Sequence, residues 1–217
     1  MYQKLKWESD RYFNFGYVLN LPKDFDPTKR YPLVFFLHGA GERGEDLDKV
    51  AVHGYMKHVR EEDADYPFIF VAPQCPHDKY WACYTESILA FLDDICEKLP
   101  IDRERVYLTG LSMGGTGTWM LAMAAPERFA AIAPICGTGI CWNTDPLLKM
   151  PICVYHGDCD PSVPIEESIS MVRGINRRGG HAVLHILHGV GHNAWNQAYA
   201  GDTLMNWFLE HKKESNG

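Results

Sequence analysis

The sequence of 217 residues contains no run approaching the ~18 consecutive apolar residues that a membrane-spanning helix requires. It also has no excess of basic residues, because 21 Lys and Arg stand against 28 Asp and Glu, a net charge of −7. This balance argues against nucleic acid or an anionic membrane surface as the main partner. The first residues carry charge and lack the apolar stretch of a secretory signal, so we expect a cytoplasmic protein, or a secreted one if a leader has been removed.

The sequence also lacks cysteines at the close spacing that metal-binding and redox motifs use. The seven cysteines are an odd number and form no C-x-x-C pair. We therefore expect reduced thiols, several of them packed as small hydrophobic side chains. If one disulfide forms in an exported protein, Cys136 and Cys141 are the pair nearest in sequence.

The composition is that of an ordinary globular protein, with 46% hydrophobic and 23% charged residues. At roughly 150 residues per domain, the length predicts one domain over residues 1–217. A core of this size needs no metal or disulfide for stability. The sequence leaves the oligomeric state open, with a homodimer as one option.

Short apolar runs alternate with amphipathic segments along the chain. The runs are bounded by Gly or Pro, which is typical of strands buried on both faces of a parallel sheet. They cover residues 33–37, 68–72, 106–108, 130–136, 152–155 and 183–187, and helices are predicted over about 88–99, 113–124, 164–179 and 204–209. The aromatic-rich stretch 12–21 is expected to add antiparallel strands at one edge. The pattern predicts an α/β fold, a mainly parallel sheet with helices on both faces.

The segment Gly110-Leu111-Ser112-Met113-Gly114 places Gly-x-Ser-x-Gly between a predicted strand and a predicted helix. A tight turn of this kind leaves no room for side chains at the two glycines and holds the serine hydroxyl clear of the backbone. A chance glycine-rich helix start is the alternative. The context favours Ser112 as a nucleophile, which needs a histidine base and an acid further along the chain.

Candidates for the acid and the base follow the next strands. Asp158 and Asp160 both follow the strand that ends near residue 155, and Asp160 is the favoured acid, with Asp158 as a turn residue. His192, next to a glycine and ahead of the last helix, is the favoured base. His188 lies nearer the strand end and is expected to be partly buried.

The loop after the first parallel strand, residues 38–44, is rich in glycine. Glycines allow backbone N–H groups to point at the negative charge that develops in acyl transfer. We expect these donors to be the N–H groups of Ala40 and Met113. A phosphate-binding loop is the alternative, but no Lys follows the glycines as it does in a P-loop.

Taken together, residues 37–41, 110–115, 156–164 and 191–192 resemble the α/β-hydrolase superfamily. Within it they are similar to the phospholipase/carboxylesterase group and to neighbouring dienelactone-hydrolase, feruloyl-esterase and polyhydroxybutyrate-depolymerase-like esterases. The resemblance implies a triad of Ser112, Asp160 and His192, oxyanion donors near Ala40 and Met113, no metal and no organic cofactor. It also implies that the loop from residue 72 to Trp81 borders the site.

A cap in this superfamily is usually inserted between the strand after the nucleophile helix and the strand before the acid. Only about fifteen residues lie between these strands here, which predicts an α/β-hydrolase fold without a cap and an open site. Trp81, Trp142 and Trp195 could then bind an aryl or acyl group, or each could simply pack over a strand end.

These features predict a serine carboxylesterase that acts on a small-molecule ester, free or attached to a polysaccharide or lipid. Short aliphatic, acetyl and feruloyl esters are the expected substrates. The alternatives are a thioesterase or lysophospholipase, a serine peptidase on the same triad, a metal-dependent hydrolase using His156, Asp158 and the late histidines, and a binding module without activity.

Overall fold

The structure, a computed structural model, describes residues 1–61 and 64–213. At its centre is an eight-stranded sheet in the order β1-β2-β4-β3-β5-β6-β7-β8. The strands are β1 (Tyr2–Trp7), β2 (Phe15–Asn20), β3 (Tyr31–Leu37), β4 (Ile69–Pro73), β5 (Ile101–Leu111), β6 (Ala131–Ile135), β7 (Ile152–Gly157) and β8 (Ala182–Leu187). β2 pairs antiparallel with both β1 and β4, and the remaining neighbours are parallel.

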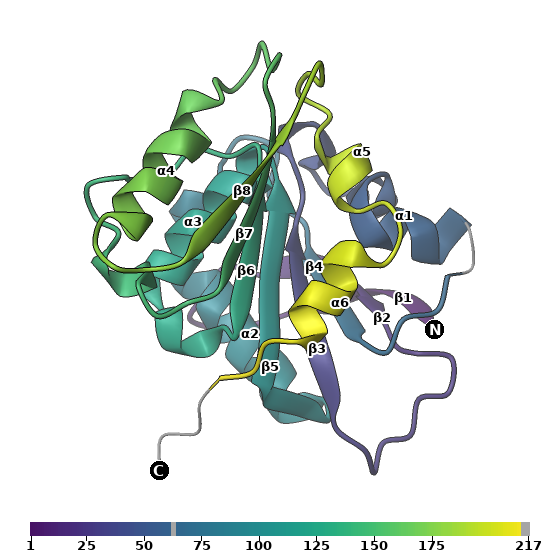
Figure 1. Ribbon diagram of the computed structural model, residues 1–217. Helices are drawn as coiled ribbons and strands as arrows, with labels where there is room; N and C mark the ends of the chain where they lie inside the picture. The colour runs from purple at the N-terminus through teal and green to yellow at the C-terminus, as the bar shows by residue number, and fades with distance from the viewer. Residues whose placement is uncertain (62–63, 214–217) are drawn as a thin grey trace.

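Helices cover both faces of the sheet (Figure 1). One face carries α2 (Thr85–Lys98), α3 (Met113–Ala124) and α4 (Glu166–Asn176), and the other carries α1 (Gly54–Glu61), α5 (Trp195–Ala198) and α6 (Thr203–Leu209). Each layer of helices encloses its own hydrophobic core against the sheet. The predicted fold class, a mainly parallel sheet between two helical layers, is confirmed.

Strand β3 illustrates why the strands read as unbroken apolar runs. Leu33 and Phe35 contribute to the core beneath α2 and α3, whereas Val34 and Phe36 contribute to the core on the opposite face. All four side chains are essentially inaccessible to solvent. Because successive residues of a strand point to opposite faces, a strand covered on both sides must be apolar at every position.

The predicted runs fall on β3 to β8, and the predicted helix over residues 113–124 coincides with α3. β5 begins at Ile101, well before the predicted start. Its first half (residues 102–105) is polar and not fully buried, so the sequence shows no apolar run there. β1 was not predicted, since its charged side chains alternate with partly buried ones. The short helices α1 and α5 were also missed, because each offers too few residues for a periodic pattern.

The connection from β6 to β7 is short, as predicted. Residues 136–151 contain a single three-residue 3-10 helix, Asp145–Leu147, and no cap is inserted there. Among the described residues, no helix is both long and apolar enough to cross a bilayer.

Helix α3 approaches the strands beneath it so closely that glycine is required. A Cβ atom added to Gly114 would lie 1.9 Å from the carbonyl oxygen of Leu37, and one added to Gly110 would lie 2.5 Å from the carbonyl oxygen of Gly114. The loop after β6 is equally close, because a Cβ atom at Gly137 would lie 2.3 Å from backbone atoms of Gly115. The start of α3 is therefore held between the ends of β3, β5 and β6.

We predict that Gly137→Ala lowers the free energy of unfolding by about 1–3 kcal/mol, because the added methyl group forces the loop and helix backbones apart. Chemical denaturation followed by circular dichroism measures the change. Gly41→Ala is the matched control, since a Cβ atom there meets nothing within 4 Å. Equal stability losses in the two variants would contradict the close contact.

Candidate active site

Ser112 occupies the turn between β5 and α3 in a strained backbone conformation. Its φ of 55° and ψ of −117° lie outside the regions that residues with a side chain ordinarily adopt. The N–H of Ser112 donates to the carbonyl of Ile135 at 2.9 Å, which ties the turn to β6. Strain of this kind costs about 1–3 kcal/mol and persists only where the surrounding structure imposes it.

The structure brings Ser112, His192 and Asp160 together. Nε2 of His192 lies 2.8 Å from Oγ of Ser112, and Nδ1 of His192 lies 2.7 Å from Oδ2 of Asp160. The three residues come from the loops that follow β5, β8 and β7, which end at one edge of the sheet. Because Asp160 accepts at Nδ1, the neutral imidazole carries its proton there and Nε2 can accept the hydroxyl proton of Ser112.

Asp160 is set up to remain ionised. Its side chain has no exposed surface, and its Oδ1 accepts hydrogen bonds from the N–H groups of Ser162 at 2.8 Å and Val163 at 2.9 Å. Burial alone would raise the pKa of Asp160, but the Val163 N–H, the His192 ring and the Ser162 N–H together hold the pKa below its usual value. The carboxylate can therefore orient His192 and stabilise its protonated form.

Asp158 forms a separate pair with His188. Oδ2 of Asp158 lies 2.8 Å from Nδ1 of His188, and Oδ1 accepts from the N–H of Gly189 at 2.7 Å. Asp158 lies in the expected turn, in which the N–H of Asp160 donates to the carbonyl of Gly157, and its side chain also links the loops after β7 and β8. The expectation that His188 is partly buried was wrong, because 85% of its side chain is exposed. Of the two Asp–His pairs, the one with Asp160 reaches Ser112.

The two expected oxyanion donors lie at the starts of helices. Ala40 is the first residue of a three-residue 3-10 helix, Ala40–Glu42, and Met113 is the first residue of α3. N–H groups in the first turn of a helix have no carbonyl partner within that helix, so they are available to an incoming oxygen. Their role as an oxyanion hole stays a prediction.

His38 supports the start of this loop from within the core. Its Nε2 accepts the N–H of Cys75 at 3.0 Å, and its Nδ1 lies 2.6 Å from the carbonyl of Gly39, so the proton sits on Nδ1. Burial lowers the pKa of His38 to about 4. The indole N–H of Trp81 donates to the carbonyl of His38 at 3.0 Å, which fixes the other side of the residue.

Two further side chains hold the loop from residue 38 to 44 in place. Nε of Arg43 donates to the carbonyl of Ala40 at 2.9 Å, and its Nη1 donates to the carbonyl of Lys79 at 3.2 Å. Nε2 of Gln74 donates to the carbonyl of Glu42 at 2.8 Å. The bonds from Arg43 to Lys79 and from Gln74 to Glu42 join segments more than thirty residues apart, so no local motif indicates them.

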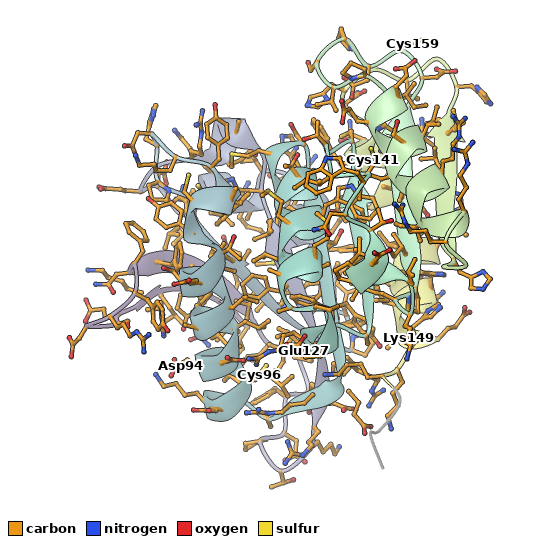
Figure 2. The ribbon with its side chains drawn as sticks, turned by 90° about the vertical axis from the view of Figure 1, so that its left-hand side faces the viewer. Asp94, Cys96, Glu127, Cys141, Lys149 and Cys159 are labelled. Carbon is orange, nitrogen blue, oxygen red and sulfur yellow. The ribbon has the colours of Figure 1, made fainter. Side chains whose placement is uncertain are left out.

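The three tryptophans expected near the site differ in exposure. Trp81 is 1% exposed and belongs to the packing under the loop, so its expected place on a substrate-binding wall is not retained. Trp195 packs edge-on against His192, with 5.3 Å between ring centroids. Trp142 is 75% exposed. Figure 2 shows its neighbour Cys141 toward the same end of the molecule as Cys159, which precedes Asp160.

One group of metal-ligating side chains occurs among the described residues, and it overlaps the triad. Potential ligand atoms of Cys136, Asp160 and His192 lie within 4.8 Å of one another. Burial raises the pKa of the Cys136 thiol to about 12, and this thiol contacts the carbonyl of His192 at 3.5 Å. A metal there would compete with the bond between His192 and Asp160. Among the described residues, His156 and Asp158 belong to no group of three potential metal ligands, although Asp158 pairs with His188.

Residues 39–44 also have the spacing G-x-G-x-x-G, contrary to the expectation that this loop matches no such fingerprint. In a dinucleotide-binding loop this pattern opens a long helix whose first turn binds pyrophosphate. Here the glycines lead into a 3-10 helix of three residues, Ala40–Glu42. The loop therefore lacks the helix that such a phosphate site uses.

Comparison with known proteins places the chain in one family. The family Esterase, described as “Putative esterase”, matches residues 14–194. The chain is 32% identical to “Probable feruloyl esterase C” of Aspergillus terreus over 76% of this chain and 62% of the relative. It is 30% identical to “Feruloyl esterase C” of Emericella nidulans over 71% of this chain and 58% of the relative. The chain thus spans about three fifths of the length of these relatives.

Solved structures agree in fold. The crystal structure of a thermostable esterase superposes with a TM-score of 0.88 at 31% identity, over 98% of this chain and 63% of that one. The feruloyl esterase module of Clostridium thermocellum, complexed with sinapinate, superposes with a TM-score of 0.73 over 92% of this chain and 84% of that one. At 14% identity the second likeness concerns the fold alone.

The burial of His38 predicts that stability falls in mild acid. Its folded pKa of about 4 lies below the unfolded value of about 6.5, so unfolding takes up a proton between these pH values. The stabilisation is complete above about pH 6.5 and is lost as the pH falls toward 4, by at most about 3 kcal/mol. Denaturant titrations from pH 7 to 4.5 measure this loss.

His38→Gln is the control for this titration, because its amide oxygen can accept the Cys75 N–H but does not bind a proton. The variant should be less stable than the wild type at pH 7 and should lose less stability on acidification. Parallel pH dependences in the two proteins would contradict the assignment.

Proposed function

The chain belongs to the Esterase family, and from this premise we propose that it hydrolyses carboxylic esters by acyl transfer through Ser112. The observation that carries the proposal is the continuous set of hydrogen bonds from the strained Ser112 through His192 to the buried Asp160. A binding module would have no need of a serine hydroxyl aligned with both a base and a buried carboxylate.

The mechanism follows from these contacts. His192 Nε2 accepts the Ser112 hydroxyl proton while Oγ attacks the ester carbonyl carbon, and the N–H groups of Ala40 and Met113 stabilise the resulting oxyanion. Asp160 stabilises the imidazolium. His192 then donates its proton to the departing alcohol, leaving an acyl-serine. A water molecule that loses a proton to His192 attacks this acyl group, and collapse of the second intermediate releases the acid and restores Ser112.

Esters of aryl or short acyl acids are the substrates we propose. Two considerations support this class: the curated relatives are named feruloyl esterases, and the described connection from β6 to β7 carries no inserted cap. Trp195 lies beside His192, and the exposed Trp142 lies in the loop between β6 and β7. Their rings offer flat apolar surfaces for an aromatic acid, while the open site leaves room for a bulky alcohol.

We predict that Ser112→Ala lowers kcat for p-nitrophenyl acetate by about 10⁶-fold, because the nucleophile is removed. Asp160→Asn should lower it by about 10⁴-fold, because the amide cannot hold the required tautomer of His192. Asp158→Asn is the matched control and should stay near the wild-type rate, since Asp158 pairs with His188. Initial-rate kinetics and labelling of Ser112 with a fluorophosphonate provide the measurements.

Unchanged turnover in Ser112→Ala would refute the acyl-serine mechanism. Loss of activity in Asp158→Asn together with full activity in Asp160→Asn would reverse the assignment of the acid. Circular dichroism spectra of the three variants separate loss of chemistry from loss of folding.

For the substrate class, we predict that Trp142→Ala raises KM for methyl ferulate about two- to tenfold, as expected when an aromatic contact of about 0.5–1.5 kcal/mol is lost. The KM for p-nitrophenyl propionate, whose acyl group is not aromatic, should change little. Trp142→Phe keeps a ring at the same position and should behave as the wild type does. An equal change for ferulate and propionate esters would count against an aryl-binding role.

A further inference from the structure

A second histidine lies behind Asp160. His156 is in β7 (Ile152–Gly157), and its side chain has no exposed surface. It lies four residues before the proposed catalytic acid, where β7 gives way to the loop that carries Asp160. Neither the triad nor the oxyanion loop uses this ring, yet both of its nitrogens have polar neighbours. A buried imidazole with two specific partners has a defined orientation.

Nε2 of His156 faces the loop of the acid. It lies 2.9 Å from the carbonyl oxygen of Val163 and 3.4 Å from Oδ2 of Asp160. The N–H of the same residue, Val163, donates to Oδ1 of Asp160 at 2.9 Å. His156 therefore contacts the carbonyl of Val163, while the N–H of the same residue holds Asp160. The ring also approaches the carboxylate of Asp160 directly.

The partners of His156 determine where its proton lies. A carbonyl oxygen can only accept, so Nε2 carries the hydrogen that is directed at Val163. In the neutral ring Nδ1 is then the acceptor, and it lies 2.7 Å from Oγ of Ser168. Ser168 is fully buried in α4 (Glu166–Asn176) and can donate its hydroxyl proton to Nδ1. Ser168 thus favours the tautomer whose N–H points toward Val163 and Asp160.

We propose that His156, oriented by Ser168, is a positioning residue that fixes the Asp160 carboxylate in the direction of His192. The inference rests on the proposed function, because it assigns a role within the same triad. With two N–H groups on Oδ1, and with His192 and the ring of His156 beside Oδ2, the carboxylate has donors on both oxygens. Rotation of the carboxylate would break several of these contacts at once.

The neighbouring pair of Asp158 and His188 provides an internal comparison. Asp158 also bonds a histidine and a backbone N–H, but its side chain is 32% exposed. Among the contacts of the described residues, Asp158 has no buried histidine behind it. The buried ring is therefore specific to the aspartate that reaches the serine through its histidine.

His156→Met removes the N–H while keeping an apolar side chain of similar length, and Ser168→Ala removes the hydroxyl that selects the tautomer. We expect kcat for p-nitrophenyl acetate to fall about 10–100-fold in His156→Met, as for a misplaced catalytic group, with KM nearly unchanged. Ser168→Ala should show a smaller loss of the same kind. His156→Gln, whose amide can donate toward Val163, should recover most of the lost kcat.

Matched controls come from the same elements. Ser170→Ala changes an exposed serine of α4, and His188→Gln changes the exposed histidine of the second pair. Both should retain wild-type kinetics. Proton NMR provides a readout that does not depend on turnover, because the His192 Nδ1–H bonded to Asp160 gives a strongly downfield resonance. This resonance should shift or broaden in His156→Met and return toward its wild-type position in His156→Gln.

Wild-type kcat and an unmoved resonance in both His156→Met and Ser168→Ala would overturn the proposal. So would a loss in His156→Met that Gln does not restore, since packing alone would then explain it. If His156→Met does not fold, Ser168→Ala and His156→Gln decide. Failure of the proposed function would look different, because the wild type would then lack esterase activity and fluorophosphonate labelling at Ser112.

Discussion

The contact between the start of α3 and the ends of β3 and β5 is the constraint on which the site depends. Gly114 lies so close to the Leu37 carbonyl that no side chain fits between them. This approach brings the loop after β3 next to the first turn of α3, so Ala40 and Met113 begin helices beside Ser112. The same closeness forces Ser112 into its strained backbone conformation. The relative positions of Ala40, Met113 and Ser112 therefore depend on this one close contact.

Parallel pairing of β7 with β8 supplies the other half of the site. The register pairs His156 with Ile186 and Gly157 with Leu187, so the loops leaving these strands emerge side by side. Two Asp–His pairs form across them, one exposed and one directed at Ser112. Burial distinguishes the two, because the interior aspartate is surrounded by donors that hold it in one orientation.

The sequence was sufficient for the layers of the fold and for the residues that meet at Ser112, because buried parallel strands and loop motifs leave local patterns. It was not sufficient where a residue's role depends on distant segments. For Trp81 the sequence left substrate binding and packing over a strand end both open, and the structure shows a buried ring that bonds the carbonyl of His38. His156 looked like one more histidine in a motif, since its contact with Ser168 joins a strand to a helix. β1 was missed because its charged side chains alternate with partly buried ones, and its contacts with β2 and with Asp94 of α2 join segments far apart in sequence.

The position of Cys136 gives thiol-directed reagents a way to act on His192. Its buried thiol touches the backbone of His192 and lies beside the carboxylate of Asp160. An adduct on that sulfur would crowd His192 and its contact with Ser112, and the proposed mechanism gives the sulfur no part in bond making. Inactivation by a mercurial or a small alkylating agent would therefore report crowding of the base, and sensitivity to such reagents is no evidence for a thiol protease-like chemistry.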